Sequence, residues 1–210
     1  MKQVADSETT EILKIAQECM SIPGDFIELG CYEGDTSLLL AEILRDFEKN
    51  RGISELSYAP ELSKELWIYD SFEGLPPKTD EDESVAGINF QAGALTVTKR
   101  EVKARFLRAN LPVPHIKKAW FADLTDEDLP SRISFAFLDG DFYQSIKDSF
   151  KAINGKMHPQ GIIIVHDYHN PELPGVTQAV DEWLAHHNDY QLIIEYSLAV
   201  LKPRVRKKDD

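Results

Sequence analysis

The sequence predicts an α/β fold built on a sheet of about seven strands, which run parallel except at the end of the chain. Extended and helical patterns alternate along nearly the whole length, which is typical of parallel strands joined by covering helices. The last two extended segments, 190–197 and 198–203, follow one another with almost no connection. They must therefore pair as an antiparallel hairpin.

Each expected strand is short and apolar. The strands are, in order, DFIELG, LWIYDS, HIKKAWFAD, ISFAFLDGD, QGIIIVHDY, YQLIIEYS and LAVLKP. The segments between them carry apolar residues at helical spacing and typical helix signals, such as a capping box at Thr98–Glu101 and a stop at Gly155. Helices are therefore expected within 1–22, at 37–47 with Thr36 or Ser37 as the N-cap, and at 102–109, 143–153 and 176–186.

Two segments do not fit this alternation. Residues 50–65 are polar and poorly periodic, which indicates an insertion or a mobile connection. Residues 79–95 follow a turn at Gly74, Pro76 and Pro77 and are too polar to pack. A loop of that length in a compact domain is typically functional or disordered, so we expect 79–95 to form a lid over a binding site.

Composition narrows the class of protein. The 210 residues suit a single domain that spans 1–210. The formal net charge is −13, so nucleic acid and anionic membrane surfaces are poor partners. There is no long apolar run and no leader-like start, and Cys19 and Cys31 are too few for a disulfide framework. We therefore expect a cytoplasmic protein, and the sequence leaves monomer and homodimer open.

The first site signal is the segment ELGCYEGDTS, where a strand passes through two glycines into a helix. Glycine lets the backbone approach a ligand closely, and a helix start offers free N–H groups to a carboxylate or phosphate. The spacing is G-x-x-x-G, and an acidic loop would repel a pyrophosphate, so a ligand with an amine or sulfonium, such as S-adenosylmethionine, is favoured. The alternative is a turn that binds nothing. The expected cofactor contacts are Glu28, Gly30, Tyr32, Glu33, Gly34, Thr36 and Ser37.

Asp70 ends the second strand and is the second signal. A carboxylate at that point is placed to accept hydrogen bonds from ribose hydroxyls, and the alternative is a helix or loop cap. The two signals support each other, because an open parallel sheet binds ligands at the carboxyl ends of neighbouring strands. Further contacts expected around the same ligand are Ser71 and Phe72 beside Asp70, Phe121 and Asp123 at the adenine, and Asp139.

Metal-ligand residues follow the fourth and fifth strands. Asp139 ends the fourth, and His166 and Asp167 end the fifth, so neighbouring strands would offer two carboxylates and one imidazole to a divalent ion. Acids on apolar strands are costly unless paired or metal-bound. The alternative is a pair of hydrogen-bonded carboxylates. Asp141 is expected to cap the next helix, and His169 to be exposed.

Together these motifs resemble the macrocin O-methyltransferase family, from about Pro23 to Trp183. The matching stretches are PGDFIELGCYEGDTS, WIYDSFEGLP, TVTKREVKARF, FLDGDFYQS and IIIVHDYHNP with GVTQAVDEW, of which D-S-F-x-G-L-P and D-G-D-x-Y are the most distinctive. The resemblance implies a Rossmann-like class I fold with helices on both faces, S-adenosylmethionine as methyl donor, and a sugar hydroxyl of a natural product as acceptor. It also implies a divalent ion, usually magnesium, held by three acids.

Carried over to this sequence, the three ion ligands are Asp139, His166 and Asp167. His166 stands where the family has an acid, and a mixed site also admits manganese or another ion. Asp139 is expected to be the base that takes the proton of the hydroxyl, with His166 as second candidate. Three alternatives remain: a nucleotide-dependent oxidoreductase, a cofactor-binding protein without catalysis, and a methyltransferase of a phenol or another small molecule.

Overall fold

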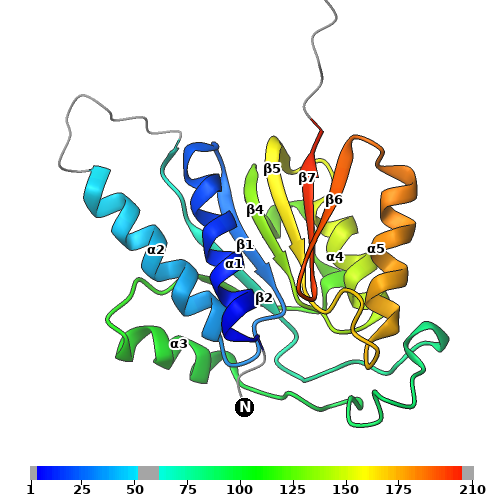
Figure 1. Cartoon of the computed structure of the whole chain (residues 1–210). Helices are drawn as coiled ribbons and strands as arrows, with labels where there is room; N and C mark the ends of the chain where they lie inside the picture. Colours follow the sequence, from blue (N-terminus) through cyan, green and yellow to red (C-terminus); the bar gives the residue numbers. More distant parts are fainter. Residues whose placement is uncertain (1–3, 52–61, 205–210) are drawn as a thin grey trace, which may run out of the picture.

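A computed structural model describes residues 4–51 and 62–204, and its strands form one seven-stranded sheet (Figure 1). The strand order is β3-β2-β1-β4-β5-β7-β6. Neighbours from β3 to β5 pair in parallel, and β7 is antiparallel to both β5 and β6. The predicted fold class is confirmed. The strands are β1 Asp25–Leu29, β2 Leu66–Asp70, β3 His115–Lys118, β4 Ile133–Leu138, β5 Met157–Val165, β6 Tyr190–Glu195 and β7 Leu198–Pro203.

Helices cover both faces of this sheet (Figure 1). On one face Ile12, Leu40 and Phe106, from α1, α2 and α3, share a core cluster with strand residues. On the other face Ile146 and Val180, from α4 and α5, belong to a second cluster. The helices are α1 Asp6–Glu18, α2 Asp35–Arg51, α3 Lys99–Arg108, α4 Tyr143–Ile153 and α5 Pro174–His186.

Burial on both faces explains why the central strands read as apolar runs. All six residues of β4 are buried, as is typical of a parallel strand covered on two sides. The register places Leu29 of β1 beside Tyr69 and Leu138, and Leu138 beside Val165. The polar residues that follow these four strands therefore emerge at one edge of the sheet.

The helix limits follow the sequence closely in two places. α4 begins and ends where 143–153 was predicted, and the capping box of α3 is confirmed, because Thr98 and Glu101 exchange side-chain to backbone hydrogen bonds. α2 begins at Asp35, so the prediction that Thr36 or Ser37 caps it is wrong, and both lie in its first turn. Most of the insertion expected at 50–65 lies outside the described residues.

Much of the segment 79–95 is exposed, but hydrogen bonds anchor it to the fold at Asp82 and Ser84, so the expectation that it is too polar to pack is wrong at these two points. Asp82 is 1% exposed; its carboxylate accepts the N–H of Tyr143, at the start of α4, at 2.7 Å and that of Thr79 at 3.0 Å. The Ser84 hydroxyl donates to the carbonyl of Pro171 at 2.6 Å, just before α5. Polar residues pack here because hydrogen bonds inside the fold replace those to water.

Within the described ranges, no helix combines the length and apolar character needed to cross a bilayer. Cys19 and Cys31 are free, buried thiols, as expected. Burial raises the pKa of Cys19 to about 12, which makes it an inert core residue rather than a nucleophile.

Candidate active site

A cavity of about 450 Å³ opens where β1, β2, β4 and β5 end. This is the crevice in which open parallel sheets bind ligands. The cavity brings together most of the residues that the sequence singled out, and the expectation that both site signals share one cleft is confirmed. Those that line it are Glu28, Gly30, Tyr32, Glu33, Thr36, Asp70, Ser71, Phe121, Asp139, His166 and Asp167.

The loop after β1 turns on residues with positive φ: Gly30 at 90°, Tyr32 at 44° and Gly34 at 80°. A Cβ on Gly30 would lie 1.8 Å from the carbonyl oxygen of Asp139, so only glycine fits there. The N–H of Asp139 in turn donates to the carbonyl of Leu29 at 2.8 Å. The glycine loop and the end of β4 are therefore in direct backbone contact.

Asp70 holds this loop in place. Its carboxylate accepts the N–H groups of Cys31 at 3.0 Å, Tyr32 at 3.1 Å and Phe72 at 2.7 Å. These bonds confirm the alternative that Asp70 caps a loop. Asp70 also lines the cavity, and a carboxylate has lone pairs beyond those used by three N–H groups.

Glu28 is a buried acid on the cavity wall, only 1% exposed. Burial raises the pKa of Glu28 to about 8, and the nearby charges of Asp139 and Asp70 contribute to this rise. The hydroxyl of Ser37 donates a hydrogen bond to the Glu28 carboxylate and acts in the opposite direction. A cationic group bound next to Glu28 would favour its ionised form.

Arg105 of α3 forms ion pairs with two other acids of the loop, Glu33 and Asp35. Its guanidinium donates to the Asp35 carboxylate and, at 2.7 Å, to the backbone carbonyl of Glu33, whose carboxylate lies 3.4 Å away. Arg105 therefore offsets part of the negative charge of this loop.

Four predicted cofactor contacts lie off the cavity wall. Phe72 is buried in the core cluster beside α3, and Asp123 is exposed to solvent. Gly34 forms the turn into α2, and Ser37 is fully buried with its hydroxyl on Glu28. Each follows a lining residue closely in sequence, but the backbone turns its side chain, or its Cα, away from the cavity.

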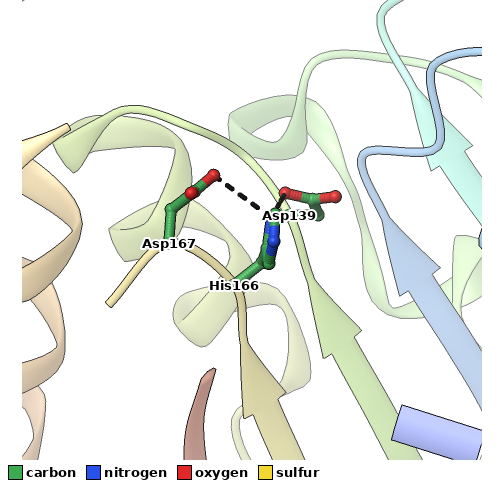
Figure 2. A group of neighbouring side chains, drawn as sticks. All are labelled: Asp139, His166 and Asp167. Carbon is green, nitrogen blue, oxygen red and sulfur yellow. Dashed lines mark hydrogen bonds and ion pairs between the residues drawn. The ribbon is translucent and has the colours of Figure 1, made fainter. Parts of the chain in front are cut away.

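Asp139, His166 and Asp167 form a compact cluster at the ends of β4 and β5, and all three line the cavity (Figure 2). One potential ligand atom from each residue lies within 4.8 Å of the others. The ring nitrogen Nδ1 of His166 is 2.9 Å from Asp139 Oδ1 and 3.1 Å from Asp167 Oδ2. Both carboxylates thus converge on one edge of the imidazole.

The cluster fits a divalent ion. Burial acts to lower the pKa of His166, but the neighbouring acids, Asp139 first, outweigh it and hold that pKa well above 6.5. In the metal-free protein the ring therefore balances the charge of the acids. Two carboxylate oxygens and one imidazole nitrogen, open to a cavity, are the donor set of a three-ligand site with free positions.

The prediction that Asp141 caps α4 is wrong, because Asp82 accepts the N–H of Tyr143 in its place. Asp141 has a φ of 60° and lines the cavity. Burial, together with Asp139 and Asp167, raises the pKa of Asp141 well above its usual range. Asp141 is therefore a further acid on the cavity wall, outside the three-residue cluster. His169 is exposed, as predicted.

Sequence reasoning missed some residues of the site. Trp120 and Phe90 line the cavity, and only the aromatic pair of Trp120 with Phe121 could have signalled the first. Glu8 of α1 lies 158 residues before His166 and contacts its ring, which no local spacing could reveal. Hydrogen bonding to His166 outweighs burial and lowers the pKa of Glu8 to about 2.

Comparison with known proteins gives relatives with named activities. The chain is 27% identical over 152 residues to the 8-demethyl-8-(2,3-dimethoxy-alpha-L-rhamnosyl)-tetracenomycin-C 4'-O-methyltransferase of Streptomyces olivaceus, covering 70% of this chain and 54% of that protein. It is 26% identical over 171 residues to the demethyldecarbamoylnovobiocin O-methyltransferase of Streptomyces niveus, with 79% and 60% covered. The chain thus spans somewhat more than half the length of these relatives.

Among solved structures, that of the O-methyltransferase NovP superposes with a TM-score of 0.77 at 23% identity, over 96% of this chain and 81% of the other. Likeness at this level of identity shows a common fold. The family described as Macrocin-O-methyltransferase (TylF) matches residues 8–196, which include every strand end that lines the cavity. With its sheet order, its cavity and this match, the chain belongs to the macrocin-O-methyltransferase family.

Proposed function

We propose that the protein transfers a methyl group from S-adenosylmethionine to a hydroxyl of a glycosylated small molecule, with a divalent ion at Asp139, His166 and Asp167. One observation carries the proposal. A single cavity has the glycine loop with Asp70 on one side and the three-ligand cluster on the other. A methyl donor and a hydroxyl bound to these two sides would meet in the same cleft.

Family membership supports S-adenosylmethionine as the donor. In this proposal Glu28 faces its positive methionine end, and Asp70 accepts hydrogen bonds from its ribose hydroxyls. The backbone near Thr36, at the start of α2, receives its carboxylate. Phe121 offers an aromatic face to the adenine.

The ion, when bound, would lower the pKa of the acceptor hydroxyl and fix its oxygen near the donor. Magnesium is the ion implied by the family resemblance, and the imidazole of His166 suits manganese as well. Asp139 takes the hydroxyl proton, since it borders both the glycine loop and the cluster. His166 is the second candidate only in a site where its ring does not bind the ion, because a ring that binds through one nitrogen and carries a proton on the other accepts no further proton. The reaction joins an alkoxide to a sulfonium, so charge is lost and a cavity that excludes water favours it.

The acceptor is proposed from the names of the relatives. The Streptomyces olivaceus protein is named for methylation of a rhamnosyl tetracenomycin, which supports a sugar hydroxyl. In this chain Trp120 and Phe90 add aromatic side chains to the cavity wall, which suit the apolar face of a sugar ring. The segment 79–95, which contributes Phe90, stays the proposed cover of the acceptor.

The test combines calorimetry with transfer of a labelled methyl group to a panel of glycosylated natural products, with magnesium and with manganese. Asp139→Asn and Asp167→Asn should abolish turnover and leave affinity for S-adenosylmethionine nearly unchanged, because the glycine loop and Asp70 stay intact. Full activity in either variant would overturn the ion-assisted scheme.

Two other results would replace the proposal. Binding of NAD without binding of S-adenosylmethionine would indicate an oxidoreductase. Binding of S-adenosylmethionine by a wild-type protein that takes up no divalent ion and methylates no acceptor would indicate a cofactor-binding protein without catalysis.

A further inference from the structure

Glu8 is a buried acid to which the proposed reaction gives no role. It lies in the first turn of α1 and is 7% exposed. A buried carboxylate is costly unless it is hydrogen-bonded or paired, so the groups around Glu8 indicate what it does.

Backbone and side-chain donors fix the position of Glu8. Its Oε2 accepts the N–H of Ala5 at 3.1 Å, and its Oε1 accepts the N–H of Ser197 at 3.2 Å and the hydroxyl of the same residue. Ser197 lies in the turn between β6 and β7, and its carbonyl accepts the N–H of Tyr168, in the loop after β5, at 2.8 Å. The carboxylate is therefore held where the first helix, the hairpin turn and the loop after Asp167 meet.

The two ring nitrogens of His166 have different surroundings. Nδ1 faces the carboxylates of Asp139 and Asp167, whereas Nε2 lies 3.5 Å from Glu8 Oε2, at the long end of hydrogen-bond distances. A neutral imidazole that binds an ion through one nitrogen carries its proton on the other, and a buried N–H needs an acceptor. Glu8 supplies an acceptor on that edge of the ring.

We propose that Glu8 is a positioning residue of the ion site, which holds the Nε2–H of His166 so that Nδ1 completes the ligand set with Asp139 and Asp167. The inference rests on the proposed function, because it takes these three residues as the ligands. The proposed role of Glu8 also requires that residue 166 be a histidine. An acid at position 166 would have no N–H for Glu8, and the two carboxylates would repel each other.

The test measures manganese binding to the full chain by electron paramagnetic resonance. The signal of the free ion gives the affinity, and pulsed measurements detect nitrogen-14 coupling from a coordinated imidazole. Glu8→Ala and Glu8→Gln probe the inference, and His166→Ala gives the spectrum without the ring. Glu11→Gln is the matched control, because Glu11 lies on the same helix and is partly buried, and its carboxylate pairs with Lys14.

Glu8→Ala should weaken manganese binding by about 10- to 100-fold, as is usual when the outer partner of a ligating histidine is lost, and should weaken the nitrogen coupling. Glu8→Gln should keep the coupling with a smaller loss of affinity, because its amide oxygen still accepts the N–H. Glu11→Gln should match the wild type.

If Glu8 only anchors α1, Glu8→Ala will lower the unfolding temperature while affinity and nitrogen coupling stay at wild-type values, which overturns the inference. If Glu8→Ala does not fold, Glu8→Gln decides, and unchanged affinity in it overturns the inference. A wild type that binds no manganese overturns both this inference and the ion of the proposed function, whereas normal binding that is insensitive to Glu8 overturns the inference alone.

Discussion

The two sides of the cavity are built by different means. At the ends of β1 and β2 the cavity depends on a loop of special backbone conformation, with two glycines at positive φ and three N–H groups that donate to Asp70. At the ends of β4 and β5 it depends on the side chains of Asp139, His166 and Asp167, backed by Glu8.

This difference implies different sensitivities. Such a loop depends on conformations and close approaches that only certain residues permit, so added atoms disrupt it. A side-chain cluster depends on charge and hydrogen bonding, so isosteric changes of charge disrupt it while the backbone stays intact. A substitution on one side should therefore leave the other side intact, except where the two sides touch.

The largest effect is expected at that point of contact, for Gly30→Ala. The new methyl would meet the carbonyl of Asp139, at a φ of 90°, so both sides should lose their geometry. We expect a loss of unfolding free energy of about 3 kcal/mol or more, with loss of both S-adenosylmethionine and manganese binding. Chemical denaturation and calorimetry measure these.

Gly155→Ala is the control for this variant. Gly155 also has positive φ, 74°, but nothing lies within 4 Å of the position that a Cβ would take there, so only the conformational cost of about 1 kcal/mol remains. Equal losses in the two variants would show that the contact between the sides has no special effect.

Asp70→Asn should disrupt the cofactor side alone. The amide places an NH₂ group against N–H donors of the loop and loses at least one charge-assisted hydrogen bond. The dissociation constant of S-adenosylmethionine should rise about tenfold or more, with manganese affinity unchanged. Calorimetry checks both. Asp167→Asn should give the reverse pattern, and a loss of both affinities in either variant would contradict the separation of the two sides.

The smallest effect concerns Glu28 and the pH dependence of stability. Burial raises its pKa to about 8 from an ordinary value of 4.5, so the unfolded chain ionises first. The contribution of Glu28 to the unfolding free energy should be fully present below pH 4.5, be lost between pH 4.5 and about 8, and then stay constant. Because glutamine does not ionise, Glu28→Gln should reduce this loss in urea denaturation, whereas Glu195→Gln, at an exposed site, should retain it. If the unfolding free energy of Glu28→Gln decreases with pH as much as that of the wild type, other groups cause the decrease.

Much of the fold could be predicted because it is encoded locally. The limits of α4, the capping box of α3 and the antiparallel hairpin follow from residues near one another in the chain. The segment 79–95 could not be predicted, because its polarity indicates exposure until Asp82 meets the free N–H of Tyr143, 61 residues later. Its anchoring to the fold depends on a partner that is distant in the sequence.

The sequence by itself determined the order of strands and helices along the chain and the polar residues at the strand ends, because these depend on local periodicity, turns and caps. It also determined that Asp139, His166 and Asp167 lie together, since parallel strands end at one edge. Only the tertiary structure decided that Arg105 pairs with loop acids, that Phe72 enters the core and that Glu8 lies behind His166. These contacts join distant segments through packing, which no spacing along the chain records.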